Sequence, residues 1–162
     1  MADEISSRNI PVLASIDLPE EPDWRAKEEK AKEDTTRAGE RLEELTEEMR
    51  VFRDRQLEAY DASINNIKQL LDAGVQVGYA SNGMKLSDLS KQVKVLIEEG
   101  NLNEDQLLNL MSQSTADILG VGTRLGEVEE GKIASFSVFD KPFTEEKAKV
   151  LYSISAGNLT EF

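Results

Sequence analysis

Short apolar runs alternate with amphipathic stretches along this chain. The runs at 10–16 and 75–80 are rich in β-branched residues and bounded by turn residues, which predicts two buried strands. Between them, apolar residues recur at steps of three and four from Arg41 to Ala73, which predicts a long helix closed by Gly74. A strand, a long helix and a second strand form a βαβ unit, so we expect the two strands to be parallel.

The remaining pattern predicts two more helices and a group of short strands. Ser87 is expected to cap a helix that runs to Glu98. Asn103 is expected to cap another helix, with Gln106 as its capping-box partner, that ends at Gly120. Three strands follow, with a turn at Gly157-Asn158 before the last of them: 133–139, 150–156 and 159–162. The whole pattern is typical of an α/β protein with a small antiparallel β element at its C-terminal end.

Charge and composition narrow the classes of function. The chain has 162 residues and a formal net charge of −13, so it repels phosphate backbones and anionic lipid heads, and we expect neither nucleic acid nor a membrane as a partner. It has no run of 18 apolar residues, and its acidic start at Met1 lacks the apolar region of a signal peptide. The compartment is left open.

The absence of two residue types bears on metal chemistry. The chain contains no histidine and no cysteine, so the usual nitrogen and sulfur ligands of a zinc-type metal are missing and no disulfide framework can form. We therefore expect no metal site and no cofactor in this chain by itself.

Residues 20–40 are rich in charge and have few apolar anchors beyond Trp24. Such a composition buries little surface, which favours a partly helical excursion from the fold. The other interpretation is a lid after the first strand. Trp24 fits both interpretations, as an anchor that docks the excursion or as a ring that stacks on a substrate.

Polar residues follow both predicted parallel strands. Asp17 comes after the first strand, and Ser81-Asn82 comes after the second. In barrels and open α/β sheets, chemistry is located at the carboxyl ends of the strands, so these residues are candidates to face a substrate. The alternative for Asp17 is a solvated turn, and for Asn82 an Asn-Gly turn with left-handed backbone geometry. Ser15 and Ser81 have no histidine base, which argues against a serine nucleophile.

The order of these segments resembles the amidohydrolase superfamily, whose members are metal-dependent hydrolases built on a (β/α)8 barrel. The block 65–83 looks like the last helix and strand of such a barrel, with a helix ending in Ala-Gly-Val and a strand ending in Ser-Asn-Gly. The block 115–140 resembles the closing segment that follows, and residues 10–16 would be strand seven. The resemblance implies an imidazolonepropionase-like or dipeptidase-like relative that hydrolyses C–N bonds of amides or cyclic amides.

The chain departs from the family at the positions that matter for catalysis. In the family, the strand-eight aspartate binds the metal and takes a proton from the attacking water, and the matching position here is Asn82. A neutral amide binds metal weakly and is no general base near neutral pH. Acidic residues of the closing segment are replaced by Ile133 and Ser135. The histidine ligands and the bridging lysine belong to strands one to six, which have no match in this chain.

The resemblance implies a fold class and a division of the chain. A closed barrel needs roughly 200 to 250 residues, so we expect a partial barrel made of its last two parallel strands and their helices. Residues 1–120 would be the C-terminal part of the barrel, and residues 121–162 the tail strands of the family's small β-domain. The chain would then be a C-terminal fragment that is not catalytic alone, and a full-length parent would carry the zinc-like divalent metal.

Two other functions compete with this interpretation. One is a non-catalytic relative that serves as a scaffold, which a His-x-His motif on an early strand of the parent would argue against. The other is a helix-mediated protein-interaction module. Because strands cut from a parallel sheet expose hydrogen-bonding edges, we expect the remainder of the barrel, or a second copy through self-association, as partner.

Overall fold

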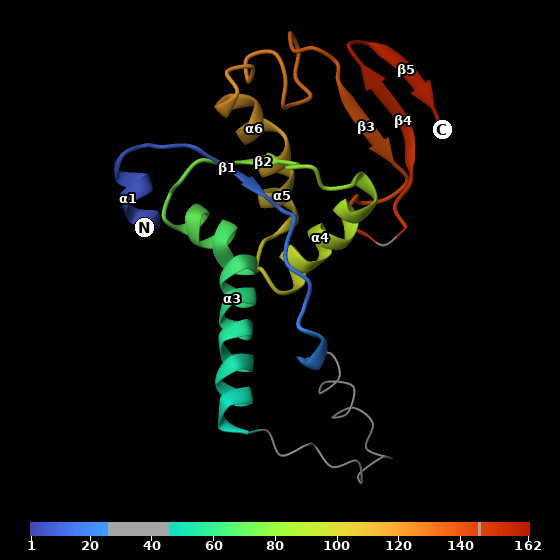
Figure 1. The fold of residues 1–162 in the computed structure, drawn as a ribbon. Coiled ribbons are helices and arrows are strands. Elements are labelled where there is room, and N and C mark those ends of the chain that lie inside the picture. Colours follow the sequence, from blue (N-terminus) through green and yellow to red (C-terminus); the bar gives the residue numbers. More distant parts are fainter. Residues whose placement is uncertain (26–45, 146) are drawn as a thin grey trace. The chain divides into compact units, whose positions relative to one another are not determined.

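The computed structural model describes residues 1–25, 46–145 and 147–162. These fall into two compact units, of which the first combines Met1–Asp17 with Asn65–Phe162 and the second is Leu18–Ile64. Figure 1 gives the order and labels of the elements.

The first unit is built around a pair of parallel strands, as predicted. After helix α1 (Ala2–Ser7), strand β1 (Val12–Ser15) pairs with β2 (Val77–Ala80), with Val12 opposite Val77 and Ser15 opposite Ala80. Figure 1 shows the two strands side by side. Both strands are shorter than the apolar runs that predicted them, because pairing stops where the chain leaves the sheet.

The long helix α3 (Glu47–Asp72) precedes β2 and ends as the sequence predicts. Gly74 has φ 76°, its N–H bonds the carbonyl of Leu71, and the N–H of Val75 bonds the carbonyl of Leu70. These two bonds form a Schellman motif, which needs a residue without Cβ strain at the left-handed position. The helix therefore stops at the residue that places β2 beside β1.

Helix α4 (Leu86–Glu98) begins one residue before the predicted cap. Its N-cap is Lys85, which makes no side-chain capping bond, so the prediction that Ser87 caps the helix was wrong. The cap of α5 (Glu104–Met111) is as predicted, because Asn103 and Gln106 form a reciprocal capping box.

The single helix predicted from Asn103 to Gly120 is two helices. Helix α5 ends at Met111, and α6 (Gln113–Ile118) starts after Ser112, which has φ −122° and ψ −93°. Around this break, the Ser112 hydroxyl donates to the carbonyl of Leu108, and the Thr115 hydroxyl donates to the carbonyl of Leu110. Serine and threonine side chains that bond nearby backbone groups compete with the helical ladder, which explains the break.

The core of the first unit is formed by aliphatic side chains from the strands and from all four helices α3 to α6. Its buried members are Ala14, Ile16, Ile67, Leu70, Val75, Val77, Val93, Leu96, Leu102, Leu107, Leu110 and Ala116. Ile16, Leu96 and Leu107 are 0% exposed, so this core is fully closed to water at its centre.

The C-terminal part forms the predicted antiparallel element. Strands β3 (Phe136–Phe139), β4 (Val150–Ser155) and β5 (Asn158–Glu161) make a three-stranded sheet in the order β3-β4-β5. The turn before β5 is one residue earlier than predicted, at Ala156 and Gly157, which both have positive φ and suit a two-residue hairpin.

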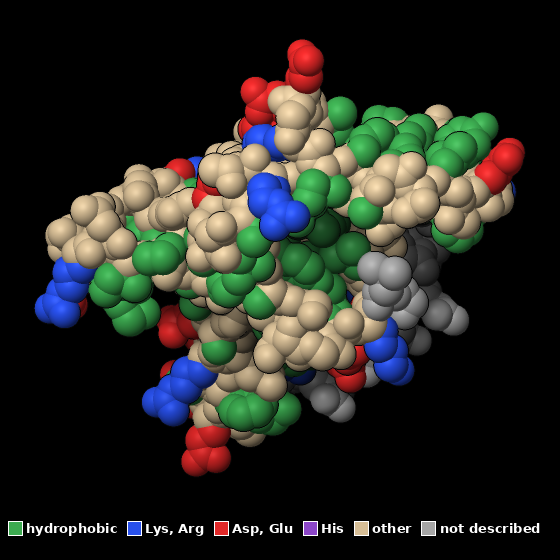
Figure 2. Space-filling model, turned by 90° about the horizontal axis from the view of Figure 1, so that it is seen from above, with side chains coloured by type: hydrophobic (Ala, Val, Ile, Leu, Met, Phe, Trp, Pro, Cys, Tyr) green, Lys and Arg blue, Asp and Glu red, His purple; other side chains and the backbone are tan. Residues whose placement is uncertain are grey.

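One face of this tail sheet is rich in apolar residues. The ladder places five of them on that face: Phe136, Val138, Tyr152, Ile154 and Leu159. Three of these are at least 36% exposed, namely Val138, Tyr152 and Leu159. Figure 2 shows hydrophobic side chains gathered at the upper right, where the tail sheet lies.

In the second unit, Trp24 contacts the first half of α3. Its indole N–H donates to the Gln56 side-chain oxygen at 3.0 Å, and the Arg53 guanidinium lies 5.1 Å from its ring centroid. Arg25 lies over the ring of buried Tyr60 at 5.6 Å. These contacts suit the anchor interpretation of Trp24. The excursion predicted at 20–40 falls mostly on residues 26–45, outside the described residues.

Candidate functional site

The parallel pairing brings the predicted strand-end residues to one end of the two-stranded sheet. Asp17 follows β1 and Ser81 follows β2, and both side chains are exposed. The backbone N–H of Asp17 donates to the Ser15 hydroxyl at 3.1 Å, which fixes the turn after β1. The sequence thus predicted correctly that these loops leave the sheet at the same end.

The Ser81-Asn82-Gly83-Met84 segment is a tight turn. The N–H of Met84 donates to the Ser81 carbonyl at 2.8 Å, and Asn82 and Gly83 have φ values of 45° and 85°. This confirms the left-handed turn geometry predicted for Asn82, which glycine and asparagine tolerate best. The further role of Asn82, as the counterpart of a catalytic aspartate, stays a prediction. So do substrate-facing roles for Asp17, Ser81 and Trp24.

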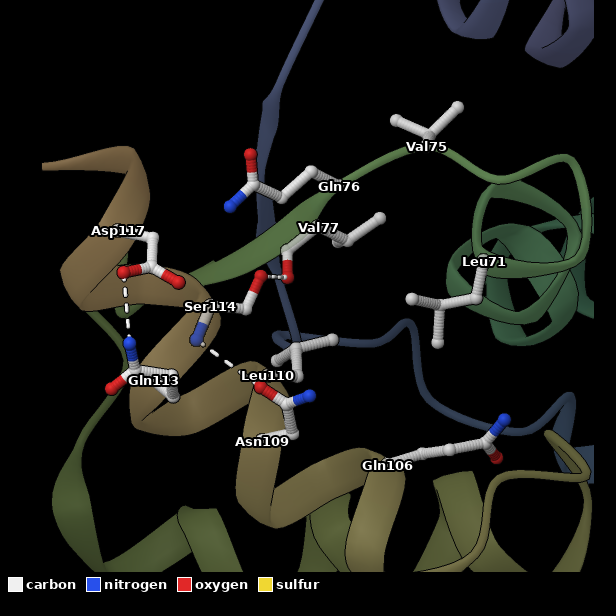
Figure 3. Close-up of a pocket in the computed structure, with 10 residues that line it drawn as sticks. All are labelled: Leu71, Val75, Gln76, Val77, Gln106, Asn109, Leu110, Gln113, Ser114 and Asp117. Atoms are coloured by element: carbon white, nitrogen blue, oxygen red, sulfur yellow. Dashed lines mark hydrogen bonds between the residues drawn. The ribbon is translucent and has the colours of Figure 1, made fainter. Parts of the chain in front are cut away.

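A cleft that the sequence did not predict lies at the other end of β2. It has a volume of about 440 Å³. Its lining comes from the end of α3, the start of β2, and α5 and α6: Leu71, Val75, Gln76, Val77, Gln106, Asn109, Leu110, Gln113, Ser114 and Asp117. Figure 3 shows the side chain of Leu110 between those of Gln113 and Leu71, with the amide groups of Gln76, Asn109 and Gln106 around it.

The amides of this cleft are oriented by their own hydrogen bonds. The oxygen of Gln106 accepts from the N–H of Asn103, and the oxygen of Asn109 accepts from the N–H of Ser114 at 3.2 Å. Asp117 accepts from the Gln113 amide at 2.8 Å (Figure 3). The sequence signal for this cleft is the spacing of Gln106, Asn109 and Gln113 by three and four residues. Amides at that spacing are also common on solvated helix faces, so the signal alone is weak.

Lys132 ties the segment before the tail sheet to α6. Its ammonium group lies 2.8 Å from a Glu127 carboxylate oxygen, 3.6 Å from one of Glu129 and 3.4 Å from the side-chain oxygen of Gln113. The hydrogen bond to Glu127 raises the pKa of Lys132 above its usual 10.5, and partial desolvation opposes this only in part. The side chain of Lys132 is 11% exposed, although its charged end reaches solvent-facing carboxylates.

The described residues offer no set of metal donors. In residues 1–25, 46–145 and 147–162, no three acidic side chains are grouped so that they could hold a metal ion. The strand ends provide one carboxylate, a hydroxyl and an amide, and the whole chain has no imidazole or thiolate. This donor set does not fit a zinc-type ion.

In the part of the chain that the structure describes, no helix is long and apolar enough to span a bilayer.

Comparison with known proteins gives one family. A model of the amidohydrolase family matches residues 22–160. A search of curated protein sequences finds no match.

Solved structures support the same fold. An amidohydrolase from Thermotoga maritima MSB8 superposes with a TM-score of 0.64 at 21% identity, over 98% of this chain and 33% of that one. A prolidase complexed with N-methylphosphonate-L-proline gives a TM-score of 0.62 at 19% identity, over 99% of this chain and 37% of that one. The chain thus spans only about a third of the length of these proteins. The family match covers most of the sequence, and the chain belongs to the amidohydrolase family.

Proposed function

We propose that this chain provides the last two strand–helix units and the tail strands of an amidohydrolase barrel, and that it is not catalytic by itself. The parent protein would hydrolyse C–N bonds of amides or cyclic amides. In this proposal β1 is strand seven, β2 is strand eight, and Asn82 stands where the family has an aspartate.

One observation carries the proposal. The two parallel strands are in register from Val12 opposite Val77 to Ser15 opposite Ala80, and both leave the sheet at the end where Asp17 and Ser81 follow. In (β/α)8 barrels, active sites are built from the loops at this end of the strands. The family match over residues 22–160 includes β2 but not β1, so it supports the proposal for the second of these strands.

The proposal that the chain is not catalytic rests on donor chemistry. A family member needs a bound metal, and the groups at the ends of β1 and β2 do not fit one. A carboxamide at position 82 cannot act as a general base near neutral pH. Asp17 alone supplies one carboxylate and no partner for a metal.

Metal retention and hydrolysis by the purified chain test this proposal. The chain is incubated with excess Zn²⁺, desalted, and its metal content is measured by mass spectrometry. It is then assayed with N-acyl amino acids, cyclic amides and an Xaa-Pro dipeptide, which is included because one structural neighbour is a prolidase. We expect substoichiometric zinc and no turnover above buffer. Stoichiometric zinc that supports hydrolysis would contradict the proposal.

A matched pair of variants tests the position assigned to Asn82. Asn82→Asp should place a second carboxylate at the strand end that carries Asp17, so added Mn²⁺ should broaden the amide NMR signals of Asp17 and Ser81. Asn101→Asp is the control, because Asn101 is also exposed and its φ of 55° is similar to the 45° of Asn82. Equal broadening in both variants would show that position 82 is only a turn position.

A second candidate function is a helix-mediated interaction module. Met49, Val51 and Phe52 in the first turns of α3 are 43%, 41% and 61% exposed. Met49 and Phe52 are three residues apart and share a helix face, which is the pattern of a helix that docks in a groove. Loss of self-association in Phe52→Glu would favour this function.

A further inference from the structure

The two outer edges of the two-stranded sheet differ in what covers them. The N–H of Val12 donates to the Gln76 carbonyl at 2.9 Å, so the backbone groups of Gln76 face β1. Because successive residues of a strand direct these groups to opposite edges, those of Val77 and Tyr79 face away from β1. We call this side the outer edge of β2. By the same alternation, Leu13 and Ser15 form the outer edge of β1.

Side chains of α6 occupy the outer edge of β2. The Ser114 hydroxyl donates to the Val77 carbonyl at 2.5 Å (Figure 3). The Thr115 hydroxyl accepts from the N–H of Tyr79 at 2.6 Å. An accepting carbonyl and a donating N–H two residues apart are the groups that a further strand would use. Ser114 and Thr115 therefore take the place of that strand.

The position of α6 is specified by more than these two bonds. The same Thr115 hydroxyl donates to the Leu110 carbonyl at 2.6 Å, which holds it between α5 and β2. A Cβ at Gly78 would lie 2.9 Å from Thr115 Oγ1 and 3.0 Å from Ile118 Cδ1, so a larger residue would force these side chains of α6 to shift. The helix covers the edge because β2 has no side chain at position 78.

The outer edge of β1 differs in exposure and in charge. Leu13 is 43% exposed, and no charged residue occurs between Ile10 and Ile16. Pro11 precedes the strand at an outward position and brings no N–H, which limits the usable edge to Leu13 and Ser15.

We infer that Ser114 and Thr115 form a hydrogen-bonding cap that excludes a further strand from β2, so that a second copy of this chain extends the sheet only along β1. Two chains of net charge −13 repel each other, and the uncharged β1 edge lets them meet without like charges in contact. The inference rests on backbone geometry and concerns this chain by itself. In the parent barrel of the proposed function, strand one would pair with the outer edge of β2, so α6 would have to leave that edge there.

The β1 edge is self-complementary in an antiparallel arrangement. With the two-fold axis at Ala14, Leu13 of one copy faces Ser15 of the other, and each such pair exchanges an N–H and a carbonyl. The result is a four-stranded sheet in the order β2-β1-β1-β2, capped at both ends by α6. An interface this small is weak, so association should depend on concentration.

Light scattering coupled to size exclusion tests the β1 contact. The wild-type mass should rise above 18.0 kDa toward twice that value as concentration increases. Leu13→Pro should remain a monomer, because it removes the outward N–H and no bond between β1 and β2 uses that group. Leu13→Ala is the matched control, which keeps the N–H and should associate like the wild type.

Hydrogen exchange tests the cap. In Ser114→Ala/Thr115→Val, the Tyr79 amide should exchange about tenfold faster, as expected for a loss of about 1.4 kcal/mol. The amides of Gly78 and Ala80, which face β1, should be unchanged. The double variant should also form species larger than a dimer. Ser112→Ala is the control, because its hydroxyl bonds only the carbonyl of Leu108, and Thr115→Ser should restore slow exchange.

Three results would overturn the inference. A wild-type mass of 18.0 kDa at all concentrations, or equal association of Leu13→Pro and Leu13→Ala, would exclude the β1 contact. Dissociation by Phe52→Glu with no effect of Leu13→Pro would place the interface on α3 instead. Unchanged exchange at Tyr79 in the double variant would exclude the cap.

Discussion

At the scale of single residues, Gly78 sets how closely α6 lies against the sheet. A methyl group at this position would lie 2.9 Å from both Leu13 Cδ2 and Thr115 Oγ1. Such overlap forces neighbouring side chains or the backbone to shift. The glycine is therefore a packing requirement, although the sequence shows it only as an interruption in an apolar run.

Gly78→Ala should lower the free energy of unfolding by about 1–3 kcal/mol, the usual range for an overpacked site. Urea denaturation measures the change. Leu13→Ala in the same background removes one of the two clashing atoms and should recover part of the loss, because Leu13 is 43% exposed and contributes little itself. A Gly78→Ala protein as stable as the wild type would show that α6 does not lie this close.

At this scale, the sequence predicted the structure correctly where a residue type favours one backbone conformation. Asn82-Gly83 and Gly74 adopt positive φ as their residue types favour. Prediction from sequence failed for the amide-lined cleft, because glutamine and asparagine occur as often on a solvated surface as in a cleft. Gln56 illustrates this, since its side-chain oxygen accepts the Trp24 indole N–H although nothing in the sequence distinguishes it from a solvated glutamine.

At the scale of elements, helix starts and stops were predicted only where a cap bonds its own helix. The Asn103 box is such a case. The break at Ser112 was missed because apolar periodicity continues across it, while Ser112 and Thr115 redirect the backbone through hydroxyl bonds. The start of α4 was misplaced because Lys85, with no capping side chain, gives no sequence signal.

Lys132 gives the link between α6 and the following segment a pH dependence. Its pKa is raised in the folded protein, so the ammonium form stabilises the fold fully below the unfolded pKa of about 10.5. This contribution is lost as the pH rises through the higher folded value. The difference in urea midpoint between wild type and Lys132→Met should therefore be constant near neutral pH and shrink above about pH 10.5. The exposed Lys91→Met is the control and should show no such trend. A difference that grows with pH would contradict the assignment.

At the scale of the whole molecule, the fold class could be predicted because the sequence patterns that indicate it extend over many residues. The runs at 10–16 and 75–80 and the helix between them define a βαβ unit, and the structure confirms their parallel pairing. The division into two compact units depends on contacts between residues far apart in the sequence, which local patterns do not encode. The division into 1–120 and 121–162 stays a prediction.

Net charge governs how copies of this chain meet. At −13, two copies repel over a distance set by ionic strength, with a Debye length of about 10 Å at 0.1 M salt. The dimer fraction should therefore rise between low salt and about 0.3 M NaCl, measured by light scattering at fixed protein concentration. A fraction that falls with salt would indicate an interface held by ion pairs rather than by the uncharged β1 edge.

The hydroxyl of Thr115 has a consequence for how this protein opens. It holds the N–H of Tyr79 with one side and the carbonyl of Leu110 with the other. If β2 or the end of α5 detaches, the Thr115 hydroxyl loses one of its two hydrogen-bond partners. We therefore expect the two segments to open together as one cooperative unit. A protease would then find cleavable backbone in both segments at once, or in neither.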